Sequence, residues 1–170
     1  MKSIFKRSFY VALTLITLNG LASDSIAQPA NNEDVAKHLQ TLTQYEIDGS
    51  FILSQAIDNV KNKALKEKLT KMKVECERNI KDLAALTHEY GREAPIHSRD
   101  FKGFFMQGYA AMRGLVSDKG VMSALHTNSK LILNAFEEAL NSDLPDHVKT
   151  RLQRIYNTKK SHLDYFASQM

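Results

Sequence analysis

Four long stretches of the chain carry apolar residues at alternating spacings of three and four. This spacing places the apolar side chains along one side of an α-helix and is typical of a helix that packs against others. No stretch shows the period-two alternation of a half-buried strand. The four stripes run from Val35 to Val60, from Leu65 to Tyr90, from Val121 to Ala139 and from Val148 to Phe166. The sequence therefore predicts an all-α fold.

The connections between these stretches predict how the helices are arranged. Short breaks near Asn62 and Asp143 join the first helix to the second and the third to the fourth, so each pair should form an antiparallel hairpin. Gly91 should end the second helix, and Asp118 should cap the third long helix. The long crossover between the hairpins contains an extra short helix over residues 101–116. This order is that of a ferritin-like four-helix bundle.

The N-terminal residues have the features of an export signal. Three positive charges precede an apolar run of about 15 residues, which is shorter than the roughly 20 residues of a membrane-spanning helix. Ser25 and Ala27 are suited to cleavage before Gln28, with a cut after Ala22 or an uncleaved anchor as alternatives. We therefore divide the chain into a signal peptide (1–27), a polar leader with the start of the first helix (28–38) and the bundle (39–170). The expected location is the periplasm or the exterior.

Charge argues against a nucleic-acid partner. The formal net charge is +4, but the signal contributes three positive charges and one negative charge, so that +2 remains after cleavage. The remaining basic residues alternate with acidic ones, as in Lys66-Glu67-Lys68. Such alternation is typical of a solvated helix face.

Cys76 is the only cysteine, so the chain has no intramolecular disulfide. Its place on the second stripe favours burial. The alternatives are a disulfide-linked homodimer and a redox-active thiol.

Each stripe is interrupted near its middle by polar or reactive side chains, which a bundle would point at one another. A di-iron centre needs a Glu from each of two helices and Glu-x-x-His from the other two, and the stripes hold too few carboxylates. A single transition metal ion, zinc or copper, is the remaining metal alternative. Its candidate ligands are Glu46, Glu75, Cys76 and His162.

Two other interpretations of the polar residues stay open. In the first, no metal or other cofactor binds, and the inward polar residues form a buried hydrogen-bonded network that fixes helix register. Its members are Glu46, Asn79, Asn128 and His162. In the second, His88 and His97 form a surface zinc site.

An aromatic segment in the crossover is the best candidate for an interaction surface. Its candidate residues are Phe101, Phe104, Phe105, Met106 and Tyr109. The rings either fill an open end of the bundle or bind a partner protein or, weakly, a membrane surface.

The chain resembles a bacterial family of unknown function within the ferritin-like group over residues 39–168. The resemblance is carried by Leu39-x-x-Leu42, by Asp48-Gly49, by Gly91, and by the run from Ala135 to Leu140 leading to Asp143-Leu144-Pro145. In addition, His162 stands where the last helix of that family is expected to have a histidine. Ser50 and the Asn128-Ser129 pair stand where family members tend to have glutamates. Both departures remove carboxylates.

The function expected from these patterns is interaction rather than catalysis. The chain shows neither a nucleophile elbow nor a phosphate-binding glycine loop. The family resemblance implies a role in envelope stress. The alternative is a metal-binding or redox protein that uses the bundle centre.

Overall fold

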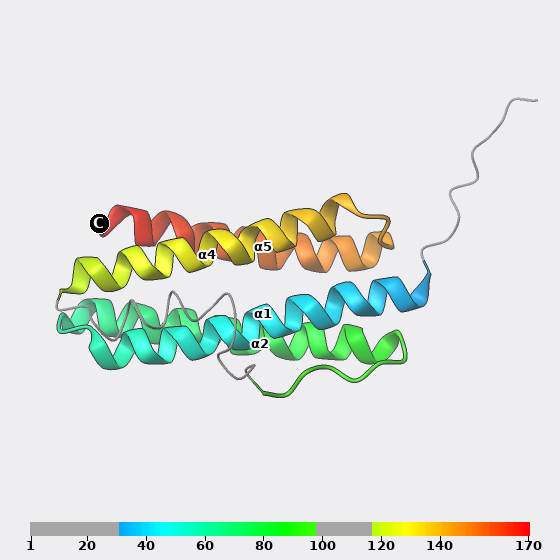
Figure 1. Ribbon diagram of the computed structural model, residues 1–170, viewed down its shortest axis with the longest axis horizontal. Helices are drawn as coiled ribbons and strands as arrows, with labels where there is room; N and C mark the ends of the chain where they lie inside the picture. Colours follow the sequence, from blue (N-terminus) through cyan, green and yellow to red (C-terminus); the bar gives the residue numbers. More distant parts are fainter. Residues whose placement is uncertain (1–30, 98–116) are drawn as a thin grey trace, which may run out of the picture.

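The computed structural model describes residues 31–97 and 117–170. These residues form four helices and no strand: α1 (Asn32–Asn59), α2 (Lys63–Glu89), α4 (Asp118–Asn141) and α5 (Asp146–Ser168). The helices pack side by side as a bundle (Figure 1), so the prediction of an all-α four-helix bundle is confirmed. The short helix predicted over residues 101–116 lies outside the described residues.

The direction of each helix follows from the contacts at the bundle ends. α1 and α2 form one antiparallel hairpin, and α4 and α5 form the other (Figure 1). The backbone N–H groups of Lys61 and Asn62, in the α1–α2 turn, donate to the Asp118 carboxylate at 2.8 and 3.0 Å. α4 therefore starts at the end of the bundle opposite to the end of α2.

The helix ends use side chains suited to them. Asn62 caps α2 by accepting from the N–H groups of Ala64 and Leu65, and Gly91 follows α2 with a φ of 74°. The prediction that Asp118 caps α4 is wrong: Ser117 is the cap and accepts from the N–H of Gly120 at 3.2 Å. Asp118 lies one residue inside the helix because its carboxylate binds the α1–α2 turn instead.

The core consists of two apolar clusters with a polar layer between them. The first cluster lies near the α1–α2 turn and consists of Ile52, Leu53, Ala56, Val60, Leu65, Leu69, Met72, Cys76, Val121, Met122, Leu125 and Phe166. The second lies near the α4–α5 turn and consists of Val35, Leu39, Leu42, Leu83, Leu86, Ile132, Phe136, Ala139, Leu144, Val148, Leu152 and Ile155. The interruptions of the stripes meet between these clusters, so that polar side chains occupy the middle of the bundle.

α1 and α4 approach closely beside the polar layer. A Cβ atom added at Gly49 would lie 3.0 Å from Cδ1 of Ile132, so the absence of a side chain at Gly49 lets the helices come together. Further along α4, Phe136 is fully buried and Ala135 is half-buried, and the stripe is buried again at Ala139.

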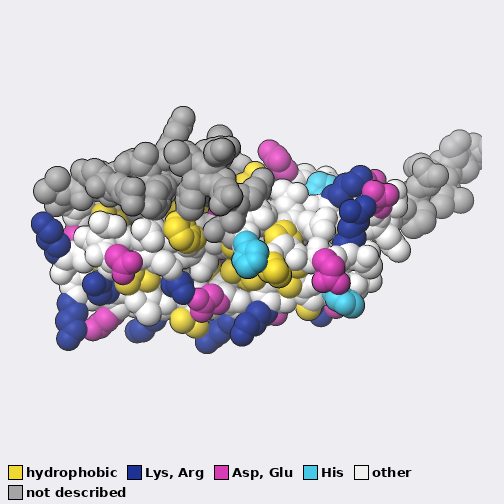
Figure 2. Space-filling model, turned by 60° about the horizontal axis from the view of Figure 1, so that its bottom comes forward, with side chains coloured by type: hydrophobic (Ala, Val, Ile, Leu, Met, Phe, Trp, Pro, Cys, Tyr) yellow, Lys and Arg dark blue, Asp and Glu magenta, His cyan; other side chains and the backbone are white. Residues whose placement is uncertain are grey.

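The surface carries both signs of charge. Lys/Arg and Asp/Glu side chains are interspersed over the face shown in Figure 2, and ion pairs such as Lys73–Glu77 and Arg92–Glu33 join some of them. Within residues 31–97 and 117–170, no helix has the length and apolar character that crossing a membrane requires.

Candidate functional site

The polar layer at the bundle centre collects side chains from all four helices. α1 supplies Glu46, α2 supplies Cys76 and Asn79, α4 supplies Asn128, and α5 supplies Lys159 with His162. All are buried, and Glu46 and Cys76 are completely inaccessible. Each lies on its helix where the apolar stripe continues on both sides, so packing of the neighbouring turns forces it inward.

Lys159 is the centre of this layer. Its Nζ lies 2.7 Å from Oε2 of Glu46 and donates to Sγ of Cys76 at 3.0 Å. Asn79 makes a longer contact of 3.5 Å with the same Glu46 oxygen. Three helices are thus joined through one ammonium group. The other carboxylate oxygen of Glu46, Oε1, is buried and has no hydrogen-bond partner among the described residues.

Burial and charge set the protonation states of this cluster. Burial raises the pKa of the Cys76 thiol to about 11, although the positive charge of Lys159 acts in the opposite direction. Burial alone would lower the pKa of Lys159, but the contacts with Cys76 and Glu46 outweigh it and hold that pKa above its ordinary value. At neutral pH the cluster therefore contains a thiol and an ammonium group, not a thiolate and an amine.

His162 forms a second pair, on the side of the layer toward α2. Its Nε2 lies 2.5 Å from Oε2 of Glu75, whose side chain is 44% exposed. Burial and the positive charge of Lys159 lower the pKa of His162 to about 4, while Glu75 acts in the opposite direction. The imidazole is therefore neutral at pH 7, and its Nε2–H donates to the Glu75 carboxylate.

A small cavity adjoins Lys159 and His162 on the side toward α1 and α4. It has a volume of about 20 Å³, and Asn128 and Ser129 contribute polar atoms to its wall. The remaining wall residues are Gly49, Leu53, Leu125, Ile132 and Phe166. A space of this size with polar walls is suited to one water molecule and is too small for an organic substrate.

The four predicted metal ligands lie in the same layer but are engaged in two separate pairs. Glu46 and Cys76 both contact the Lys159 ammonium, and Glu75 contacts His162. A metal ion between Glu46 and Cys76 would meet that positive charge, so these residues do not fit a metal ion as they are arranged. Among the described residues, no group of three or more His, Cys, Asp or Glu side chains is placed to hold a metal ion.

The buried network predicted for the centre is found in part. Glu46 and Asn79 contact each other, but His162 pairs with Glu75 and Asn128 lines the cavity. Burial of Cys76 is confirmed. The contacts of Lys159 with Glu46 and Cys76 were not predicted, because a helical pattern shows that a lysine points inward but not which groups it meets.

A further polar group on α1 was missed. The buried Gln44 donates to Oδ1 of Asp48 at 3.0 Å and to the backbone carbonyl of His97 at 3.1 Å, and Gln40 donates to the carbonyl of Glu93 at 2.6 Å. These contacts fasten the segment after α2 to the flank of α1. The available signal was the i, i+4 spacing of the two glutamines beside the apolar stripe.

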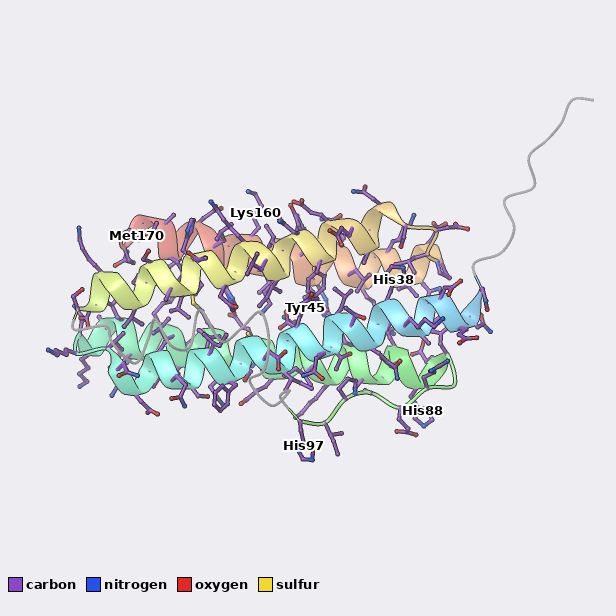
Figure 3. All side chains as sticks on the ribbon, viewed as in Figure 1. His38, Tyr45, His88, His97, Lys160 and Met170 are labelled. Carbon is purple, nitrogen blue, oxygen red and sulfur yellow. The ribbon has the colours of Figure 1, made fainter. Side chains whose placement is uncertain are left out.

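The other predicted sites are only partly covered by the structure. His88 and His97 lie at different places along the lower edge of the molecule (Figure 3), which does not support a shared zinc site. All five residues of the predicted interaction segment fall outside the described residues. That segment therefore stays a prediction.

Comparison with known families decides the classification. The model of the family described as Domain of unknown function (DUF2383) matches residues 34–142, which is more than half of the chain. The chain belongs to the DUF2383 family. The match covers most of α1 and all of α2 and α4, so Glu46, Cys76 and Asn128 lie within it, whereas Lys159 and His162 follow it. A search of curated proteins finds no match.

Proposed function

We propose that this DUF2383 protein is an exported, non-catalytic helical bundle that acts by binding a partner through its surface. A role in envelope stress, which the family resemblance implies, belongs to the same proposal. Export rests on the charged and apolar pattern of residues 1–27.

The position of Lys159 is the observation that carries this proposal. A bundle that uses its centre for metal or substrate keeps inward polar groups available to that ligand. Here the lysine engages the Glu46 carboxylate and the Cys76 thiol. The arrangement favours a structural role for the polar layer. We therefore assign the binding function to the surface of the bundle.

An exposed apolar residue supports the crossover as the place of interaction. Ile96 is 80% exposed and follows Pro95, immediately before the segment that contains Phe101, Phe104 and Phe105. Because Ile96 is close in sequence to the aromatic residues, it would enlarge an apolar patch that they form, and contiguous exposed patches mark binding surfaces.

The alternative function is a mononuclear metal-binding or redox protein. It is favoured by one observation, the buried Oε1 of Glu46 that has no hydrogen-bond partner among the described residues. Such an atom could serve as a ligand if the side chain of Lys159 moved away.

Metal analysis separates the two functions. The protein is purified without chelator or affinity tag, and its metal content and thermal midpoint with added Zn²⁺, Cu²⁺ or Fe²⁺ are measured. We expect no stoichiometric metal and no shift of the midpoint, because Lys159 supplies the cation of the centre. One metal ion per chain that is lost in His162→Ala and retained in the exposed control His88→Ala would refute the proposal and support the alternative.

Substitutions in the crossover test the interaction. We expect Phe105→Asp to keep the wild-type thermal midpoint and helical circular dichroism. It should no longer bind the proteins that the wild type binds from an envelope extract. Val74→Asp is the matched control, because Val74 is 41% exposed on α2 and lies outside the segment in sequence. If Phe105→Asp unfolds the protein, the ring belongs to the core and the proposed surface is wrong.

A further inference from the structure

Cys76 and Lys159 form a buried pair of nucleophilic groups whose chemistry the proposed function does not use. They are 83 residues apart in sequence, and their Sγ and Nζ atoms lie 3.0 Å apart across α2 and α5. Cys76 is completely inaccessible and Lys159 is 4% exposed. Both side chains are held by packed helices, so that this short separation is a fixed feature of the fold.

We infer that this pair is an oxidation site, at which hydrogen peroxide joins Sγ of Cys76 to Nζ of Lys159 through a single oxygen atom. The inference does not depend on the proposed function. It assigns a covalent modification to the centre of the bundle and names peroxide as its oxidant.

The separation of the two atoms favours an oxygen bridge over a direct bond. A direct sulfur–nitrogen bond is much shorter than 3.0 Å, so α2 and α5 would have to move together in a close-packed core. One inserted oxygen spans the existing gap with little movement. A disulfide within the chain is excluded because Cys76 is its only cysteine. A disulfide between two chains is disfavoured because the thiol is buried.

Two neighbouring features suit the reaction. The cavity of about 20 Å³ is lined by Lys159 and not by Cys76, so it can hold a molecule of about the size of water beside the amine, and hydrogen peroxide is only slightly larger. The partnerless Oε1 of Glu46 is a buried proton acceptor within the cluster, and its Oε2 already contacts the lysine. The carboxylate can therefore receive a proton from either reacting group.

The reaction consumes two molecules of hydrogen peroxide. In the first step, the sulfur of Cys76 attacks one peroxide oxygen, the O–O bond breaks, and a sulfenic acid and water form. In the second, the Lys159 amine, having passed a proton to Glu46, attacks another peroxide, giving a hydroxylamine and water. The hydroxylamine oxygen then displaces the sulfenic hydroxyl as water. Sulfur and nitrogen each lose two electrons, and the product is one S–O–N bridge with three waters.

The protonation states make this reaction slow, since the contacts with Cys76 and Glu46 hold the pKa of Lys159 above its ordinary value and its neutral amine is scarce. The pKa of Cys76 is raised to about 11, so only a small fraction of the sulfur is thiolate at neutral pH. The modified form therefore accumulates only during prolonged exposure to peroxide, and the reaction is unsuited to rapid peroxide removal.

The bridge would join the two helices that long side chains already connect. His162 contacts Glu75 at 2.5 Å, Arg154 pairs with Asp82, and Tyr90 contacts His147 at 3.2 Å across the same seam. A covalent link at Cys76 adds a reducible covalent connection between the N-terminal and C-terminal hairpins.

Mass spectrometry of the purified protein tests the inference. The reduced protein is incubated with hydrogen peroxide and digested with trypsin. We expect a linked peptide that contains both Cys76 and Lys159, heavier by one oxygen and lighter by two hydrogens, and separated again by dithiothreitol. Trypsin should fail to cut after the modified Lys159 and still cut after Lys160, whose side chain points outward (Figure 3).

Each other product overturns the inference. These products are an unmodified thiol, a sulfinic or sulfonic acid without a link, a linked peptide that has lost two hydrogens without gaining oxygen, and an intermolecular disulfide. Lys159→Arg keeps a positive charge but should abolish the link, whereas Lys160→Arg should retain it. Persistence of the same link in Lys159→Arg would equally contradict the assignment.

Discussion

Replacing Lys159 by methionine should lower the free energy of unfolding by about 3–5 kcal/mol, the usual cost of leaving one member of a buried ion pair without its partner. The change removes the ammonium that lies 2.7 Å from Glu46 and leaves a carboxylate with no exposure to solvent. Methionine fills a similar volume, so a cavity contributes little to the loss. Urea unfolding at pH 7, followed by circular dichroism, measures the change.

The neighbouring lysine is a matched control for this experiment. Lys160 is exposed, so Lys160→Met should change the unfolding free energy by no more than about 0.5 kcal/mol. The double variant Glu46→Met with Lys159→Met should recover most of the stability, because an apolar pair leaves no buried charge. Wild-type stability in Lys159→Met alone would show that the ion pair does not hold the centre together.

Lowering the pH from 7 to 5 should reduce the unfolding free energy by about 2 kcal/mol through His162 alone. The folded pKa is about 4, below the ordinary value of 6.5, because the side chain is buried and close to Lys159. The unfolded state therefore takes up a proton at a higher pH than the folded state. Neutral His162 makes its full contribution to the free energy of unfolding above pH 6.5. This contribution declines as the pH falls from 6.5 to 4.

Two histidine variants isolate this contribution. His162→Gln should lose the decline between pH 7 and 5, whereas His88→Gln should retain it because His88 is exposed. Lys159, Glu75 and Lys68 are the charged groups that act on His162, and both variants keep all three. An equal decline in wild type and His162→Gln would assign the pH dependence to other groups.

The spacing of apolar residues predicted most of the fold, because burial of a helix face is a local property with a fixed period. Every member of the α1 stripe, from Val35 to Val60, is buried, and the break at Asn62 is where α2 is capped. The errors were local. Ser117 caps α4 in place of Asp118, and Phe136 is buried more deeply than Ala135. Both depend on contacts between separate segments, which the pattern of a single helix does not show.

The location of the candidate site was predicted, but the contacts between its residues were not. Glu46, Cys76 and His162 do lie inside the bundle, as their stripes required. Their pairing was not predictable, because Glu75 is partly exposed and reaches His162 from the flank of α2. Similarly, Gln44 and Asp48 lie off the α1 stripe but are buried, and Gln44 contacts both Asp48 and the segment after α2.

The sequence by itself determined that four helices would form and that polar side chains would interrupt their apolar faces at mid-length, since both follow from residue spacing along one chain. Only the tertiary structure decided what those side chains do. The ammonium of Lys159 lies between the Glu46 carboxylate and the Cys76 thiol because α1, α2 and α5 meet there at one level. Contact between charges depends on the register of three separate helices, and a one-residue shift in any of them would replace this ion pair with different neighbours.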